Sequence, residues 1–231
     1  MQKTTVFNLI ILDESGSMSS ARKATVSGCN EVIDGAKSLA AAHADKENAF
    51  MSIYAFQSGS AVPSRYLCKN EPVKNARHIT EKDYIPMGLT PLLDAVGATL
   101  VDLKAVASTH SDAYGVVTVI TDGEENDSKE FTYAQVASLI SELKEQGWTF
   151  NFIGANIDVE QASRKLNIDN AMAFTSDEVG TAAMFKEYND RNMEFQSARM
   201  EMEAAIPHAC EEDLRAVRRK LSGKFFSKGR K

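Results

Sequence analysis

The stretch from Val6 to Ser17, VFNLIILDESGS, decides the fold. Its first half is an apolar run interrupted only by Asn8, which is typical of a parallel strand buried on both faces. The run ends in Asp13, Ser15 and Ser17, which place one carboxylate and two hydroxyls at alternate positions around a glycine. In open α/β sheets, ligands bind at the carboxyl ends of the strands. We therefore expect a buried strand that delivers three oxygen-bearing side chains to a binding edge.

Length and composition predict an ordinary globular protein with one main domain. The chain has 231 residues, of which 43% are hydrophobic and 25% are charged. Its N-terminal apolar run is too short for a membrane span, and no cleavage-site pattern precedes it, so we expect neither a leader peptide nor membrane contact. The three cysteines are widely spaced and have no metal-binding pattern. Because this usage favours a reducing compartment, we expect a cytoplasmic protein.

Charge divides the chain into two unequal parts. The net charge is −6, but residues 211–231 hold eight basic and three acidic residues, so they carry +5 and leave −11 for residues 1–210. An acidic body favours cations and disfavours nucleic acid, whereas the tail alone can attract a polyanion. We predict a main domain over residues 1–205 and a basic C-terminal helix and tail over residues 206–231.

Strands and helices alternate along the main domain. Hydrophobic periodicity predicts strands at residues 6–12, 49–56, 115–121, 148–154 and 171–174, with a short antiparallel edge strand at 65–68. Helices are predicted at residues 19–42, 91–103, 132–146, 158–166, 178–203 and 211–221, followed by a frayed tail unless Phe225 and Phe226 dock. This alternation predicts a Rossmann-like, doubly wound α/β fold. Its sheet is mostly parallel, with the order 3-2-1-4-5-6 and helices on both faces.

Two further oxygen-bearing side chains are expected at the same edge of the sheet. Thr90 precedes Pro91 at a predicted helix start, and Asp122 directly follows the strand 115–121. That strand neighbours the first one in the predicted order, so Asp122 is expected beside Asp13. All five side chains offer oxygen rather than nitrogen or sulfur, which favours a hard divalent cation, with Mg²⁺ as the natural candidate.

These motifs closely resemble the metal-ion-dependent adhesion site of the von Willebrand factor A domain family. The resemblance covers roughly residues 4–195 and rests on D-x-S-x-S at 13–17, G-x-T-P-L at 88–92 and T-D-G at 121–123. It implies a non-catalytic domain of the intracellular bacterial or phage type that binds Mg²⁺ or Mn²⁺ and, through the metal, an Asp or Glu of a partner protein. The metal ligands that it implies are Asp13, Ser15, Ser17, Thr90 and Asp122.

Other interpretations of these residues stay open. The polar side chains can simply cap the helices that follow them. A haloacid-dehalogenase-like phosphatase also has an Asp after its first strand and uses Mg²⁺, but its pattern needs a second acid where this chain has Ser15. The basic tail can bind RNA or another polyanion, although a solvated helix is the expected structure because no aromatic residues interleave a basic groove. Asp94 is interpreted as a helix first-turn acid, and Glu124, Glu125 and Asp127 as a solvated loop.

Overall fold

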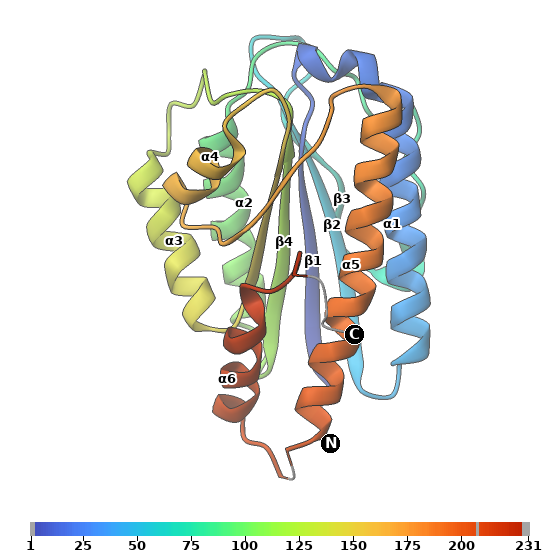
Figure 1. The fold of residues 1–231 in the computed structure, drawn as a ribbon, viewed down its shortest axis with the longest axis vertical. Coiled ribbons are helices and arrows are strands. Elements are labelled where there is room, and N and C mark those ends of the chain that lie inside the picture. The colour runs from blue at the N-terminus through green and yellow to red at the C-terminus, as the bar shows by residue number, and fades with distance from the viewer. Residues whose placement is uncertain (1–2, 207, 228–231) are drawn as a thin grey trace.

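A six-stranded sheet runs through the centre of the molecule (Figure 1). The computed structural model describes residues 3–206 and 208–227. The strands are β1 (Thr4–Asp13), β2 (Glu47–Phe56), β3 (Arg65–Pro72), β4 (Ala113–Thr121), β5 (Thr149–Gly154) and β6 (Asn170–Ala173). They follow the order β3-β2-β1-β4-β5-β6, with β3 antiparallel to β2 and the other neighbours parallel. The predicted fold class and strand order are therefore confirmed.

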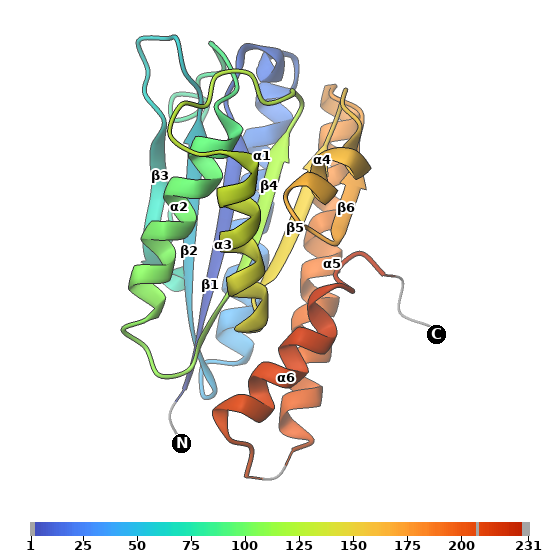
Figure 2. The same cartoon turned by 90° about the vertical axis from the view of Figure 1, so that its left-hand side faces the viewer.

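Helices cover both faces of the sheet (Figures 1 and 2). One face carries α1 (Arg22–Ala42) and α5 (Glu178–Ala204), which pack against each other. The other face carries α2 (Leu92–Ala107), α3 (Tyr133–Glu145) and the short α4 (Val159–Lys165). The last helix, α6 (Glu211–Ser222), lies below α3 and beside the end of α5. The molecule is thus a three-layer sandwich with the sheet in the middle.

Strand β1 occupies the most protected place in this sandwich. It lies between β2 and β4, and every residue from Leu9 to Asp13 is buried. Its register with β4 pairs Leu12 with Ile120, so the two strands end at the same height. The predicted buried strand is confirmed, and the loops after β1 and β4 begin side by side.

The segment after β1 differs from the single helix that the sequence predicts. Residues Gly16–Ala21 form a 3₁₀ helix, η1, and the α-helix begins only at Arg22. The Ser19 hydroxyl donates to the Gly16 carbonyl at 2.7 Å. Serine side chains that bond nearby carbonyls compete with regular α-helical bonding, and tight turns are frequent at helix starts. The early serines are therefore outside α1.

Two smaller boundaries also differ from the prediction. The edge strand β3 continues to Pro72, beyond its predicted end at residue 68, and is followed by a short 3₁₀ turn, η2 (Val73–Asn75). Pro91 precedes α2 as its N-cap and does not form its first residue.

The end of the chain is more firmly attached than the sequence predicts. Phe225 is buried, stacks on Tyr188 with ring centroids 5.6 Å apart, and packs on Phe195. Of the two predicted alternatives, fraying or docking, the structure shows docking for Phe225, while residues 228–231 lie outside the described residues. Helix α6 has acids in its first turn and bases in its last, as predicted, but it is solvated on only one side because Arg218 is buried. The division at residue 205 stays a prediction.

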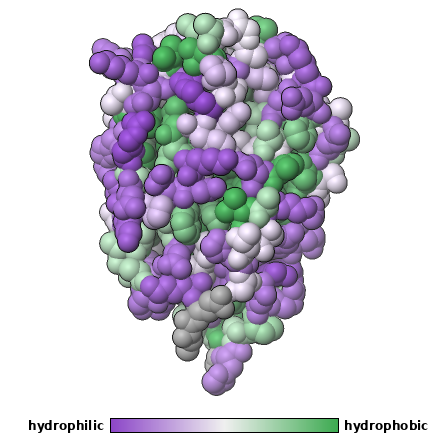
Figure 3. All heavy atoms as spheres, turned by 180° about the vertical axis from the view of Figure 1, so that it is seen from behind, coloured by the Kyte–Doolittle hydropathy of each residue, from purple (hydrophilic) through white to green (hydrophobic). Residues whose placement is uncertain are grey.

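The surface and the cysteines do not determine the cellular compartment of the protein. Seen from behind, the molecule is mainly hydrophilic with separate apolar patches (Figure 3). Within residues 3–206 and 208–227, no helix has both the length and the apolar character needed to cross a bilayer. Cys29 and Cys68 are buried, Cys210 is exposed, and all three are free thiols. The cytoplasmic location stays a prediction.

Candidate metal centre

The side chains predicted to form a metal site come together at the carboxyl edge of the sheet. Asp13 ends β1, and Asp122 follows β4 directly. The Ser17 hydroxyl donates to Asp122 Oδ1 at 2.5 Å, and the Ser15 and Ser17 hydroxyl oxygens are 3.1 Å apart. The two carboxylates are therefore bridged by the serines of the first loop.

Thr90 reaches the same place from the loop before α2. A Cβ atom placed on Gly123 would lie 3.2 Å from Thr90 Oγ1, 3.9 Å from Ser17 Oγ and 4.0 Å from Asp13 Oδ2. Side chains from three loops thus surround one small space beside Gly123, and the absence of a side chain there keeps this space open. We call Asp13, Ser15, Ser17, Thr90 and Asp122 the metal centre.

The alternative of simple helix capping does not describe these hydroxyls. Pro91 is the N-cap of α2, so the Thr90 hydroxyl does not cap that helix. Thr90 is 3% exposed, and the Asn126 side chain holds its backbone amide, not its hydroxyl, at 2.8 Å. Ser15 precedes η1 but makes no side-chain capping bond. The Thr90 hydroxyl is therefore not used as a helix cap and lies at the space beside Gly123, where a ligand can reach it.

The carboxylate of Asp13 lies in surroundings that disfavour its charge. Its side chain is buried, and burial raises its pKa to about 6, against the lowering effect of hydrogen bonds from the Thr121 hydroxyl at 2.6 Å and the Ser15 amide at 2.7 Å. The neighbouring Asp122 raises it further. A cation held between Asp13 and Asp122 would offset both effects on Asp13.

The chemistry of the donor set fits a hard divalent cation. Among the described residues, no three His, Cys, Asp or Glu side chains cluster as a metal site. At the metal centre two carboxylates are combined with three hydroxyls, which are all oxygen donors. Mg²⁺ accepts such ligands and keeps several waters, so a shell with two carboxylates is sufficient.

Glu14 is a residue of this region that the sequence did not single out. It is fully buried, and its carboxylate accepts hydrogen bonds from Arg65 at 2.7 and 3.0 Å, from the Gln57 amide at 2.9 Å and from the Ile85 backbone at 2.5 Å. The backbone carbonyl of Glu14 also accepts from Met87. The first loop is therefore tied to β3 and to the loop that carries Thr90. No local pattern pairs Glu14 with an arginine 51 positions away.

The acidic loop after β4 is folded back onto α2, which corrects the expectation of a solvated loop. Glu125 accepts from the Leu93 backbone at 2.9 Å and from the Ser128 backbone at 2.7 Å. Asn126 holds the backbone of Thr90 through two hydrogen bonds. Its side-chain oxygen accepts from the Thr90 backbone amide at 2.8 Å, and its own backbone amide donates to the Thr90 carbonyl. Only Glu124 is exposed as predicted. This folding brings the loop of Asp122 to Thr90.

Two other side chains that the sequence did not indicate hold these loops. The Ser176 hydroxyl, just before α5, donates to Asp122 Oδ2 at 2.7 Å. Asp94, predicted only as a first-turn acid of α2, accepts from the backbone amides of Lys129, Glu130 and Phe131. Neither contact follows from a sequence spacing.

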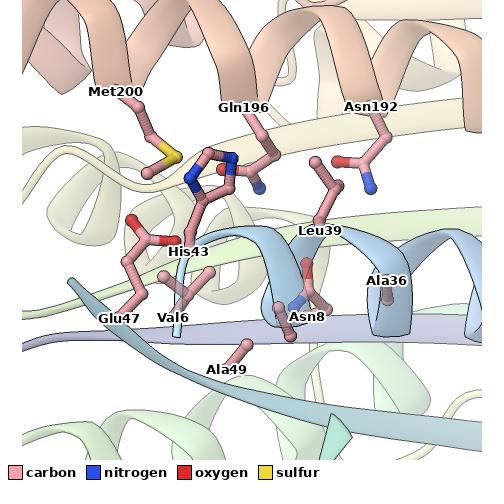
Figure 4. Close-up of a pocket in the computed structure, with 11 residues that line it drawn as sticks. Val6, Asn8, Ala36, Leu39, His43, Glu47, Ala49, Asn192, Gln196 and Met200 are labelled. Atoms are coloured by element: carbon pink, nitrogen blue, oxygen red, sulfur yellow. The ribbon is translucent and has the colours of Figure 1, made fainter. Parts of the chain in front are cut away.

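A small cavity between α1 and α5 is not a competing ligand site (Figure 4). It is lined by Val6, His43, Glu47 and Met200 among others, so it lies toward the start of β1, away from Asp13. Its volume of about 20 Å³ leaves room for roughly one water molecule. This cavity is therefore no alternative to the carboxyl edge of the sheet.

Comparison with known proteins identifies the fold. No protein-family model and no curated protein matches the sequence. The pilus adhesin SpaC from Lactobacillus rhamnosus GG matches with a TM-score of 0.58 and 12% identity over 84% of this chain and 30% of that chain. Proximal thread matrix protein 1 from the mussel byssus matches with a TM-score of 0.55 and 11% identity over 83% and 47%.

A third solved structure carries the name of the fold family. A von Willebrand factor type A structure from Catenulispora acidiphila matches with a TM-score of 0.51 and 18% identity over 83% of this chain and 43% of that chain. Another structure of the mussel protein has zinc in its metal-ion-dependent adhesion site (MIDAS) motif. It matches with a TM-score of 0.54 and 12% identity over 83% of this chain and 46% of that chain. The chain spans less than half the length of these proteins. Their shared architecture shows that this chain has the fold of a von Willebrand factor A domain.

Proposed function

We propose that this chain is a protein-binding module that acts through a bound divalent cation. Asp13, Ser15, Ser17, Thr90 and Asp122 would hold Mg²⁺, with Mn²⁺ as an alternative, and an Asp or Glu carboxylate of a partner protein would bind an open position of the metal. The observation that carries the proposal is the convergence of oxygen donors around Gly123, where Thr90 Oγ1, Ser17 Oγ and Asp13 Oδ2 face one space and Ser17 bonds Asp122.

The charge of the metal centre supports an anionic partner group. Two carboxylates balance a divalent cation, and the serine and threonine donors add no charge. The loaded centre would thus be close to neutral, so that a further carboxylate can approach it without opposing a surplus of negative ligands. A hard cation with exchangeable waters provides the position for this carboxylate.

A phosphatase is less well supported by the same residues. The general acid that such chemistry needs would come from the position of Ser15, and serine cannot supply a proton at neutral pH. The only acid beside Asp13 in this loop is Glu14, whose carboxylate is buried in an ion pair with Arg65. We therefore propose binding without catalysis.

Polyanion binding through the tail is also less well supported. Arg218 pairs with Asp112, Arg215 with Glu211, and Arg219 with Glu212. These basic groups are engaged within the molecule.

Metal binding can be tested by thermal unfolding of the purified chain. Wild-type protein should gain stability as Mg²⁺ rises, by about 2.7 kcal/mol at a hundred times the Kd, and EDTA should reverse the gain. Asp13→Asn should keep the fold, because it removes a charge that burial disfavours, and should abolish the response to Mg²⁺. The control Asp45→Asn changes an exposed carboxylate and should respond as wild type does.

Either of two results would contradict the metal site: no stabilisation of wild type by Mg²⁺ or Mn²⁺, or the same stabilisation of Asp13→Asn. The partner function is tested separately by retention of host proteins on the immobilised chain in Mg²⁺ and in EDTA. A retained protein whose binding is unaffected by EDTA and by Asp13→Asn would contradict the proposed role of the metal in partner binding.

A further inference from the structure

The surface that surrounds the metal centre has a uniform charge. We call residues 14–21, 86–91, 122–127 and 175–180 the metal rim; they contain no Lys or Arg. Its exposed charged side chains are Glu124, Asp177 and Glu178. The field in front of the metal centre is therefore negative.

Three basic residues that flank the metal rim are engaged with other groups, and two of them pair with the rim acids Glu14 and Asp127 rather than with Glu124, Asp177 or Glu178. Arg65 pairs with Glu14, and Lys129 lies 3.7 Å from Asp127. Arg22 donates to the carbonyl of Tyr84. They do not offset the charge of the exposed acids. A lone partner carboxylate would thus be attracted by the metal but repelled by the rim.

Apolar side chains gather on the same rim. Among the described residues, the large hydrophobic side chains that are exposed are Met87, Leu89, Val101, Val179 and Met193. Met87, Leu89 and Val179 belong to the metal rim, and Figure 3 shows apolar side chains at that end of the molecule. Exposed apolar side chains that cluster at one place mark contact surfaces.

The arrangement of these side chains places them on two sides of the metal centre. Met87 and Leu89 flank Gly88, whose carbonyl accepts from the Gly16 amide of the first loop. Val179 lies in the first turn of α5, three positions after Ser176, which contacts Asp122. A partner segment whose acidic residue reached the metal would meet apolar side chains and exposed carboxylates next to it.

We propose that the metal rim selects a protein segment in which the acidic residue is accompanied by Lys or Arg and by an apolar residue. The basic side chain would pair with Glu124 or Glu178, and the apolar side chain would cover Leu89 or Val179. The proposal rests on the proposed function, because the acidic residue is bound through the metal. The convergence of Thr90 Oγ1, Ser17 Oγ and Asp13 Oδ2 on the space beside Gly123 is the independent sign that the centre itself takes a ligand.

A random peptide library displayed on phage tests this selectivity. The library is bound to the immobilised chain in saturating Mg²⁺ and released with EDTA. Peptides from wild type should be enriched in Asp or Glu, with Lys or Arg and an apolar residue within about three positions. The rim variant Glu124→Lys/Glu178→Lys should keep the enrichment in Asp or Glu and lose the enrichment in Lys and Arg. Asp177 is left unchanged because it caps α5.

Matched controls separate the rim from general effects of charge. Glu31→Lys/Glu201→Lys reverses two exposed glutamates on α1 and α5 and should select the same peptides as wild type. Leu89→Ser should lose the apolar enrichment, whereas Val101→Ser, at a comparably exposed position of α2, should not. A synthetic peptide of the enriched sequence should bind the rim variant roughly two- to fivefold more weakly per reversed charge, measured by fluorescence anisotropy in saturating Mg²⁺.

The outcomes distinguish the rim from the metal. Enrichment in Asp or Glu without basic or apolar neighbours would overturn the rim proposal and leave the proposed function intact. The rim proposal would also be overturned if the rim variant selected the same peptides as wild type. It would be overturned as well if the rim variant bound the peptide as tightly as wild type at Mg²⁺ concentrations that give both proteins the same metal occupancy, calculated from Mg²⁺ affinities measured by thermal unfolding. Release by EDTA of no acidic peptides from any variant would overturn both.

Discussion

At the scale of single residues, the proposed metal centre surrounds a position that has no side chain. Gly123 lies between Asp122 and the acidic loop, and a Cβ atom there would come within 4.0 Å of oxygens from Thr90, Ser17 and Asp13. Its φ angle is not in the left-handed region, so the backbone would accept alanine. The space beside it, rather than the conformation of the chain, is what glycine provides.

Gly123→Ala should therefore weaken Mg²⁺ binding by tenfold or more while the protein stays folded. The added methyl group would occupy the space that the oxygens share, and at 3.2 Å from Thr90 Oγ1 it is closer than a normal contact. Isothermal titration with Mg²⁺ measures the change, and Gly223→Ala, whose Cβ would meet only Asp169 at 3.8 Å, is the control. Equal Mg²⁺ affinity in Gly123→Ala and wild type would show that the cation does not bind there.

At the scale of elements, the sequence predicts the structure correctly where a strand and the side chains that follow it are adjacent in the chain. The apolar run of β1 and the oxygens that follow it are adjacent in the chain, and so are β4 and Asp122. The alternation of strands and helices then determines which strand ends are neighbours. Both the sheet order and the convergence of the metal centre could be predicted for this reason.

Contacts between distant segments could not be predicted in the same way. Glu125 bonds the start of α2, and Phe225 packs on Tyr188 of α5. Each of these residues has an ordinary local context, an acidic loop in one case and a polar tail in the other. Which residues they contact depends on how the helices and loops pack around the sheet. Hydrophobic periodicity predicts the individual elements but not these contacts between them.

The contact between Glu14 and Arg65 should hold the first loop to the edge strand β3. Arg65→Met would leave a fully buried carboxylate without its ion pair, and should lower the free energy of unfolding by roughly 2–3 kcal/mol, less than for a fully buried pair because the Arg65 side chain is partly exposed. The double variant Glu14→Gln/Arg65→Met removes the unpaired charge and should recover part of this loss. Urea unfolding measures both, and a strictly additive double variant would contradict the pairing.

Helix α6 should be attached through a pH-dependent contact. Burial alone would raise the pKa of Asp112, but the hydrogen bonds of Arg218, at 2.6 and 3.1 Å, and its charge outweigh this and lower that pKa. A carboxyl group with a lowered pKa stabilises the fold above its ordinary pKa of about 3.9 and loses this contribution as the pH falls.

Asp112→Asn should accordingly lower the free energy of unfolding near pH 7 by roughly 1–3 kcal/mol, and the difference from wild type should shrink below pH 4. Denaturant unfolding at a series of pH values measures it. Asp45→Asn, an exposed change, should give a curve parallel to that of wild type. A difference that is constant across the whole pH range would mean that Asp112 does not titrate against Arg218.

At the scale of the whole molecule, α5 joins two polar centres at opposite ends of the sheet. It begins just after Ser176, which contacts Asp122 of the metal centre. Near its other end Arg199 is buried and pairs with Glu47 and Glu203. Arg218 of α6 pairs with the same Glu203 and also with Asp112 just before β4, so the last helix is bound both to α5 and to the sheet. This connectivity favours one cooperative unit that includes the tail.

Phe225→Ala tests whether the tail is part of that unit. Its ring packs on Tyr188 and Phe195 of α5, so its removal should lower the free energy of unfolding of the entire chain by about 3–5 kcal/mol, in a single transition seen equally by circular dichroism and tryptophan fluorescence. Phe226→Ala, at the half-buried neighbouring ring, should have a much smaller effect. Mg²⁺ affinity should not change, because the rings pack away from the metal centre. If Phe225→Ala left the main transition unchanged, residues 206–231 would be an independent appendage, as the charge distribution of the sequence suggests.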